Sequence, residues 1–404
     1  MNAAAAPSDD ERLARVALAR LGEPGETRLA GLAAELGAVR LYEALCAERD
    51  PRGLLADVAG RLAGVDPERD LRRAEKLGIR YVIPGDAEWP SRLDDLAGAG
   101  SLHERSGAPI GLWVRGPLDL SSLDRSLAVV GSRSATTYGL RVADEIAATA
   151  ARSGVSVISG AAFGIDQAAH RGALAVGGMT VAVLACGADR AYPEAHRALI
   201  DHIGSVGAVV SESPPGCSPT RIRFLARNRL IAALGTGTVI VEAAIRSGAL
   251  NTANWTDRLN RVVMGVPGPV TSAQSQGVHQ LVRTGAASLV TCGSDVLELI
   301  SLAGDHLRED PREPTRPRDR LTSRQRQVID AVPVRAPAPV DSVARTAGMG
   351  LLEVRSTLTR LAERGLVELV RGGWRLVDTR GGRGPGEEAK LVGLPGSAGD
   401  SLRT

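Results

Sequence analysis

The feature that most constrains this chain is a series of short, almost wholly apolar runs that alternate with helical patterns from about residue 110 onward. The runs are 127–130, 155–158, 181–184, 208–210, 239–241 and 262–266. Continuous apolar strands separated by helices are typical of a parallel sheet that helices cover on both faces. The sequence therefore predicts an α/β core with a doubly wound, Rossmann-like, mostly parallel sheet.

The pattern differs on both sides of this core. Apolar residues at helical spacing over 9–75 predict a small all-helical domain. Near the C-terminus, three helical patterns precede two apolar runs about Gly372 and Gly373, which predicts a winged helix. The predicted divisions are 1–104 for a helical domain of the SAM or helix-hairpin-helix kind with its lead-in, 105–303 for the core, 304–320 for a proline-rich linker, 321–378 for the winged helix and 379–404 for a disordered tail.

The charge balance limits where a nucleic acid could bind. The net charge is only +3, so any such site must be a local patch. The only lysines are Lys76 and Lys390, and the abundance of arginine is explained by codon bias without any DNA-binding role. Composition alone therefore predicts no partner.

Cysteine usage and the apolar pattern indicate a compartment. The four cysteines, Cys46, Cys186, Cys217 and Cys292, lie far apart and form no CxxC pair. We therefore expect neither a metal site nor a disulfide framework, which suits a reducing cytosol. The N-terminus has no signal-peptide pattern and no run of about 18 apolar residues occurs, so we expect a cytoplasmic protein without a membrane contact.

The first predicted strand ends in a candidate phosphate site. In an open parallel sheet, ligands bind at the carboxyl ends of the strands. Here the strand is followed by Gly131, Ser132 and Arg133 and then by a helix, whose N-terminal N–H groups can face an anion. Arg133 can add a bidentate grip on phosphate. Because the next glycine is Gly139, the GxGxxG pattern of a dinucleotide site is absent, and a plain tight turn with Arg133 on a solvated rim stays open.

A second glycine-rich loop follows the next strand at residues 159–166 and opens another helix. Asp166 and His170 are four residues apart and so share a helix face. A general acid/base pair is conceivable, but we favour a structural role in which the carboxylate orients the imidazole or holds the loop. Gly131, Gly164, Asp166 and His170 are therefore predicted to shape the two loops.

The most distinctive segment lies after the fourth strand. Four arginines fall within nine residues, at Arg221, Arg223, Arg227 and Arg229. Phe224 and Asn228 lie among them, and a single strand needs both cations for its backbone and a flat face for a base. Phe163 and Phe224 are the only phenylalanines, and both are predicted in loops at the ligand edge. The alternative is that Phe224 covers a hydrophobic pocket under its own loop.

Taken together, these segments resemble the motifs of the DNA-processing protein A (DprA/Smf) family. The matching stretches, in the family's order and at similar spacing, are VGSR at 130–133, SGAAFGIDQAAH at 159–170, SESPPG at 211–216, FLARNRLIA at 224–232, SGALNTA at 247–253 and VPG at 266–268. The resemblance extends over nearly the whole chain. It implies the same three-part organisation, with a helical N-terminal domain, a Rossmann-like core and a winged helix.

The resemblance implies a protein that is not an enzyme and needs no cofactor or metal. Such proteins bind and protect incoming single-stranded DNA and help to load the RecA recombinase during natural transformation, and their core forms a homodimer. The DNA-binding residues implied here are Ser132, Arg133, Ser159, Gly160, Phe224, Arg227 and Asn228, with Arg229, Ser247 and Gly248 as weaker members.

The chain departs from the family pattern at two places. Leu225 and Ala226 stand where the family usually has proline and a basic residue, so either the affinity is lower or Arg221 and Arg223 substitute. The predicted helix 350–364 mixes acidic and basic residues, so we expect the winged helix to contact protein, or DNA only weakly.

Two other functions remain open at this stage. The run GTGTVIVE at 235–242 resembles a turn of nucleoside-monophosphate phosphoribohydrolases, in which Glu242 would act on the ribose, although their G-G-x-G-T run is missing. The second alternative is a transcription regulator whose winged helix reads duplex DNA. A nuclease is disfavoured because no carboxylate cluster with metal-site spacing occurs at the predicted sheet edge.

Overall fold

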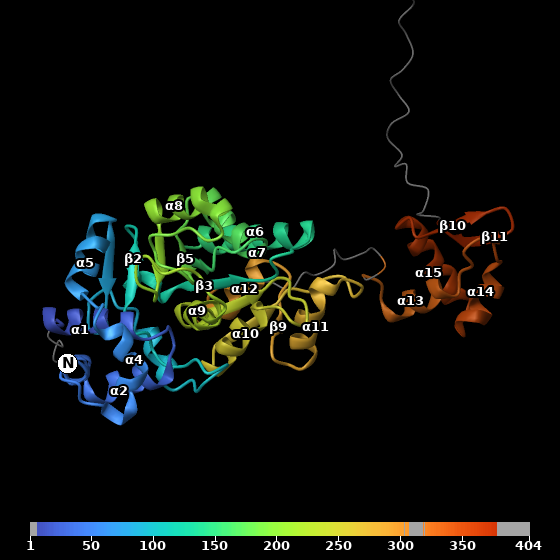
Figure 1. The fold of residues 1–404 in the computed structure, drawn as a ribbon. Coiled ribbons are helices and arrows are strands. Elements are labelled where there is room, and N and C mark those ends of the chain that lie inside the picture. The colour runs from blue at the N-terminus through green and yellow to red at the C-terminus, as the bar shows by residue number, and fades with distance from the viewer. Residues whose placement is uncertain (1–5, 303, 307–317, 319, 378–404) are drawn as a thin grey trace, which may run out of the picture. The chain divides into compact units, whose positions relative to one another are not determined.

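The structure of the protein is a computed structural model (Figure 1), which describes residues 6–302, 304–306, 318 and 320–377. The chain divides into two compact units, with the boundary after residue 308. Each unit is described by itself. None of the helices within the described residues is long and apolar enough to cross a membrane.

The first unit is built on a mixed sheet whose described strands follow the order β1-β2-β6-β5-β4-β3-β7-β8-β9. The strands are β1 (Ile79–Val82), β2 (Leu112–Arg115), β3 (Ser126–Val130), β4 (Ser156–Ser159), β5 (Thr180–Leu184), β6 (Ala208–Ser211), β7 (Gly237–Ile240), β8 (Val262–Gly265) and β9 (Ser288–Leu289). Strands β3 to β9 pair in parallel, whereas β1 and β2 pair antiparallel. The predicted Rossmann-like α/β fold is confirmed, with all six predicted strands present.

Three strands were not predicted. Strand β2 pairs antiparallel with β6, and β1 extends the sheet by pairing with β2. Both are four residues long and carry an arginine, and β9 is a two-residue exposed edge, so none gives a clear apolar run. Since β1 lies within 1–104, the predicted division at residue 104 separates two neighbouring strands of one sheet.

Helices cover both faces of the sheet. The alternation along β4 shows why both of its central residues are apolar. Val157 packs in the cluster with α6 (Thr137–Arg152) and α7 (Ile165–Ala175), while Ile158 packs on the opposite face. That opposite face is covered by α9 (Arg221–Leu234) and α10 (Ala249–Arg258). The remaining helices of the core are α8 (Arg197–Val206), α11 (Gln276–Arg283) and α12 (Gly293–Ile300).

The N-terminal segment is helical, as predicted. Its helices are α1 (Asp9–Leu21), α2 (Thr27–Leu36), α3 (Ala38–Cys46), α4 (Leu55–Leu62) and α5 (Pro67–Lys76). The first four share a core of their own, whereas Ala74 of α5 packs with Tyr81 of β1 in a cluster that belongs to the sheet. Arg12 of α1 donates to both carboxylate oxygens of Asp86, at 2.9 and 2.7 Å, just beyond β1. The helical segment is thereby fixed to the antiparallel end of the sheet.

The second unit contains the elements predicted for a winged helix, in the predicted order. They are α13 (Ser323–Asp330), α14 (Val340–Ala347), α15 (Leu351–Glu363) and a hairpin of β10 (Val367–Val370) and β11 (Gly373–Leu376). Thr322 and Gln325 form a capping box at the start of α13. Most of the predicted linker 304–320 and all of the predicted tail 379–404 lie outside the described residues.

The packing of β2 predicts the effect of a core substitution. Trp113 of β2 is fully buried, and its ring centroid lies 4.4 Å from that of Tyr81 on β1. Trp113→Ala should lower the free energy of unfolding by about 3–5 kcal/mol, because it removes a large buried ring. Urea unfolding followed by circular dichroism measures this. The control Val270→Ala removes a side chain that is 84% exposed, so it should change stability by less than about 0.5 kcal/mol. An unchanged midpoint for Trp113→Ala would show that β1 and β2 do not unfold with the sheet.

Candidate functional site

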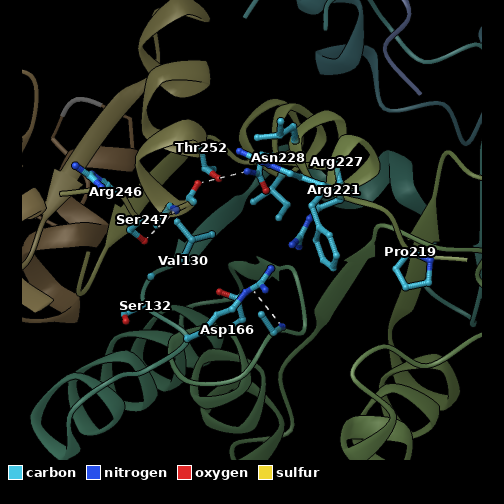
Figure 2. A pocket seen from close by; sticks show the side chains of 18 of the residues that line it. Val130, Ser132, Asp166, Pro219, Arg221, Arg227, Asn228, Arg246, Ser247 and Thr252 are labelled. Atoms are coloured by element: carbon cyan, nitrogen blue, oxygen red, sulfur yellow. Dashed lines mark hydrogen bonds between the residues drawn. The ribbon is translucent and has the colours of Figure 1, made fainter. Parts of the chain in front are cut away.

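A groove of about 700 Å³ opens at the carboxyl ends of the central strands (Figure 2). Strands β4, β3 and β7 are neighbours in the sheet, so the segments that follow them lie at one edge. The groove is lined by residues of 130–134, 162–166, 219–231 and 244–252, together with Tyr192. In Figure 2, Arg246 and Pro219 lie at opposite sides of the groove. The loops that the sequence singled out after β3 and β7 therefore meet, along with the start of α9.

The lining of the groove is strongly cationic. Its charged residues are Arg133, Arg221, Arg227, Arg246 and Asp166. Arg133, Arg221 and Arg246 are exposed and form no ion pair within the described part of the chain. Four guanidinium groups against one carboxylate give the groove a positive charge that suits a polyanion.

The one carboxylate of the lining is committed to the fold. Asp166 is buried and accepts hydrogen bonds from the N–H groups of Gly160, at 3.2 Å, and Ala162, at 3.3 Å. Burial raises the pKa of Asp166, and the nearby Arg227 opposes that rise. The side chain therefore holds the 159–166 loop closed instead of pointing a free charge into the groove.

Arg227 forms the floor of the groove and is almost wholly buried. One of its terminal nitrogens donates to the carbonyl of Val183 at 3.1 Å, and its Nε has no hydrogen-bond partner among the described residues. Burial lowers the pKa of Arg227, while Asp166 acts in the opposite direction. Because an unmade hydrogen bond and an incompletely paired charge are both costly in the interior, Arg227 is a guanidinium that burial stabilises only in part.

Phe224 lies in the first turn of α9, so its predicted position in a loop was wrong. Thr220 caps this helix by accepting from the N–H of Arg223, and the helix carries Phe224 into the groove. The Cζ atoms of Arg133 and Arg227 lie 4.9 and 5.8 Å from the centre of the Phe224 ring. The ring of Tyr192 is 5.5 Å away. The half-buried ring thus lies among two cations and another aromatic ring.

Arg229 is not part of the groove lining. Its side chain is fully buried, and its two terminal nitrogens donate to both carboxylate oxygens of Glu212 at 2.8 and 2.7 Å. The helical turn explains the difference from Arg227: two residues along a helix point in different directions. In the structure Arg229 therefore ties α9 to the end of β6, and its guanidinium is not available to a ligand.

Two other predicted residues lie behind the lining. Ser159 is fully buried and donates from its hydroxyl to the carbonyl of Val129 at 2.7 Å. A side chain on Gly160 would overlap the guanidinium of Arg227, so glycine is what leaves room for that group. Both residues therefore act on the groove through their neighbours.

Ser132, Asn228, Ser247 and Gly248 do line the groove. The amide of Asn228 donates to the carbonyl of Gly248 at 3.4 Å and to the side chain of Asn251 at 3.1 Å. These bonds join α9 to the start of α10. The structure thus brings together Ser132, Arg133, Phe224, Arg227, Asn228, Ser247 and Gly248 from three separate segments of the chain.

The remaining loop residues shape the two loops, and Gly131 also lines the groove. A side chain at position 131 would collide with the carbonyl of Glu242, so only glycine fits there. Gly164 has a φ of 78°, which favours glycine. The imidazole of His170 is fully buried, and its Nδ1 lies 2.7 Å from the hydroxyl of Thr180. Burial lowers the pKa of His170 to about 3, so the ring is neutral near neutral pH. Thr180, not Asp166, orients this imidazole.

Glu242 has a structural partner that the sequence did not indicate. Its buried carboxylate accepts from the N–H of Thr136 at 2.8 Å and from the hydroxyl of the same residue. It therefore anchors the start of α6, which gives no support to a role on a ribose. No group of three or more possible metal ligands occurs within the described residues.

Two of the charged and aromatic residues in the groove lining were not predicted from the sequence. Arg246 directly precedes the Ser247-Gly248 turn and could have been included with it. Tyr192 lies eight residues beyond β5 in an irregular segment, and no pattern in the sequence links it to Phe224.

The fold and the groove define a Rossmann-like α/β protein with a cationic, aromatic-bearing site at the carboxyl ends of its strands. Residues 80–301 match the family model of the DNA recombination-mediator protein A. A Mycobacterium tuberculosis protein described as a DNA processing protein, DprA, is 42% identical over 386 residues, which are 93% of this chain and 97% of the relative. Protein Smf of Escherichia coli K12 is 36% identical over 303 residues, 73% of this chain and 76% of its own length.

The X-ray structure of DNA processing protein A from Streptococcus pneumoniae matches with a TM-score of 0.60 and 29% sequence identity. The match covers 74% of this chain and 100% of the Streptococcus chain. The chain belongs to the DNA recombination-mediator protein A (DprA/Smf) family.

The buried ion pair between Arg229 and Glu212 predicts that Arg229 stabilises the fold. Arg229→Met leaves the carboxylate of Glu212 without its partner, so the free energy of unfolding should fall by about 3–5 kcal/mol. The double variant Arg229→Met/Glu212→Gln removes the stranded charge and should recover part of the loss. Urea unfolding followed by circular dichroism measures both. An Arg229→Met protein that unfolds like wild type but has lost affinity for an oligonucleotide would contradict the structural role.

Proposed function

We propose that the groove binds single-stranded DNA and that the chain acts as a mediator of recombination without catalysing a reaction. The observation that carries the proposal is the ring of Phe224 with the guanidinium groups of Arg133 and Arg227 at 4.9 and 5.8 Å from its centre. A single strand presents phosphates and free base faces together, whereas a duplex hides its base faces by stacking. Alternating cations and aromatic rings therefore favour the single strand.

Each lining residue has a distinct part in this proposal. Arg133, exposed and without a carboxylate partner in the described chain, exchanges its contact with the ring for a phosphate, and a base stacks on Phe224. Arg227 supplies fixed charge from the floor. Ser247 and Gly248 lie at the start of α10, where the helix dipole favours an anion. Ser159 and Gly160 support Arg227 from behind the lining.

In the same proposal, the bound strand is protected and passed to the RecA recombinase during natural transformation, in the cytoplasm. The family's description as recombination mediators supports this, because a mediator works by delivering DNA to the strand-exchange protein. The C-terminal unit serves as a protein-binding or weakly DNA-binding part. Helix α15 carries Glu353 and Glu363 beside Arg355 and Arg360, so it lacks the excess of positive charge of a strong recognition helix.

A homodimer through the core is a further part of the proposal. Strand β9 pairs with β8 on one side, and no described strand pairs with its other side. Leu289 of β9 is 52% exposed. An open strand edge with an exposed leucine is a surface that a second copy can cover.

DNA binding is tested by titrating a fluorescent oligonucleotide of about 30 nucleotides, enough for more than one single-strand site, in single-stranded and duplex form across a salt series. The single strand should bind more tightly. Arg133→Ala should reduce the slope of log K against log salt by about 0.7 for each phosphate that the arginine neutralises. Phe224→Ala should weaken binding by about 1–3 kcal/mol without changing the slope, because stacking releases no counterions.

Matched controls separate the groove from general effects. Arg141 and Val270 are exposed and lie outside the groove lining, so Arg141→Ala and Val270→Ala should bind like wild type. If wild type ignores single strands, or if the groove variants bind like the controls, the assignment fails. Release of free base from a nucleoside monophosphate, abolished by Glu242→Gln, would then favour the hydrolase instead.

The dimer is tested separately by light scattering. Leu289→Lys places a charge on the open edge, so the measured mass should fall from that of a dimer to that of a monomer. Val270→Lys, at another exposed apolar position, is the control and should leave the mass unchanged. A wild-type monomer, or a Leu289→Lys dimer, would overturn this part of the proposal.

A further inference from the structure

We propose that the basic face of α5 is a second phosphate-binding surface, which contacts the DNA strand after it leaves the groove past Tyr192. The inference rests on the proposed function, because it requires that a strand occupies the groove. It assigns a DNA contact to the N-terminal helical segment, in addition to the loops of the Rossmann-like core.

The basic face of α5 consists of Arg69, Arg72, Arg73 and Lys76. These residues are spaced at i, i+3, i+4 and i+7, so they form one stripe along the helix. All four side chains are exposed, while Ala74 on the other side of the helix is buried against the sheet. The stripe lines a hollow of about 490 Å³ together with Leu77 and Asp189.

The acidic groups near the stripe neutralise only part of it. Glu68 pairs with Arg72 at 3.0 Å. The carboxylate of Asp189 accepts from the N–H of Gly216, at 2.9 and 3.0 Å, and lies 3.9 Å from Arg73. Asp66 caps α5 by accepting from the backbone N–H of Arg69, and Asp70 is paired with Arg20 on the other side of the helix. Glu75 is also exposed on α5, but the side chains of Arg69 and Lys76 form no ion pair within the described part of the chain. Positive charge therefore remains available on a solvated surface.

A short segment connects this face directly to the groove. Gly216 lies against the guanidinium of Arg73, and the carbonyl of the next residue, Cys217, accepts from the N–H of Gly187 at 3.0 Å. Ser218 is contacted by Arg190 at 3.3 Å. Pro219 then lines the groove itself. The α5 face and the groove are thus separated by a few residues of packed backbone, with the exposed Arg190 between them.

Tyr192 lines the groove and lies two residues beyond Arg190 in the sequence. Its ring is 43% exposed and lies 5.5 Å from the ring of Phe224. It follows Arg190 in the sequence, and this irregular segment contacts the 216–218 segment. A base stacked beyond Phe224 therefore leads the backbone toward Arg190 and on to α5.

The chemistry of the α5 face favours a phosphate backbone over a specific protein. Its hollow is lined by long, solvated cations, and Leu77 is the one apolar side chain among its lining residues. Such a surface holds polyanions through counterion release and does not select a sequence. The contact should therefore add affinity only for strands long enough to reach it.

The test uses the full chain and two fluorescent oligonucleotides of the same base composition. One is about 6 nucleotides long, which matches a small single-strand site, and the other is about 30 nucleotides long, which extends beyond such a site. The variant is Arg69→Gln/Arg72→Gln/Lys76→Gln. Arg73 is kept because it contacts Gly216 and Asp189. The control, Arg141→Gln/Arg152→Gln/Arg171→Gln, removes the same charge from exposed positions on α6 and α7.

For the long oligonucleotide, the α5 variant should lower the salt slope by about 2, at about 0.7 for each phosphate that is no longer neutralised, and reduce affinity at least about tenfold at low salt. Its binding of the short oligonucleotide should equal wild type, and the control should change neither. An α5 variant that matches the control on the long strand, or that weakens binding of short and long strands equally, would overturn the inference while the groove assignment stands. If wild type binds neither strand, the proposed function itself has failed.

Discussion

The carboxyl ends of parallel strands all lie at the same edge of a sheet, and the groove of this protein depends on that constraint. Strands β4, β3 and β7 are neighbours, so the loops that leave them meet although they lie far apart in the sequence. The constraint holds only while helices cover both faces, since the strands have no solvated side. Glu242 contributes at the junction, because its carboxylate fixes the start of α6 beside the end of β7. The position of the groove is therefore a property of the sheet, and its chemistry is a property of the loops.

Burial of charge shapes those loops. Arg227 lies beneath the groove with its guanidinium removed from water, which is tolerated only with compensating contacts. The carbonyl of Val183 accepts a hydrogen bond from the guanidinium, and Asp166 supplies the opposite charge. Gly160 leaves space for the guanidinium because it has no side chain. Arg229, two residues further along α9, is compensated differently, through a bidentate pair with Glu212. Arg227 therefore lies beneath the groove, whereas Arg229 joins two elements of the fold.

The antiparallel strands β2 and β1 place the N-terminal segment beside this site. Because β2 pairs with β6, helix α5 comes to lie against the same end of the sheet as the segment that leads into α9. Arg223 of α9 donates to both carboxylate oxygens of Glu23, at 2.8 and 2.7 Å, in the turn after α1. The bidentate geometry, with only 15% of the Arg223 side chain exposed, makes this a strong contact. The helical segment is thus structurally continuous with the groove, which the predicted domain divisions did not indicate.

The sequence by itself determined the Rossmann-like sheet, because six strands buried on both faces appear as short, almost wholly apolar runs. It also located the loops after β3 and β7, since ligand-facing loops follow strand ends in chain order. The tertiary structure alone decided that β1 and β2 join the sheet, because short strands at its end gain their stability from pairing and burial and not from local pattern. It likewise decided which arginines face the groove: Arg227 and Arg229 look alike in the sequence, and only helix direction and the position of Glu212 separate them. Tyr192 joins Phe224 for the same reason, since contacts between distant segments are fixed by packing and leave no trace in residue spacing.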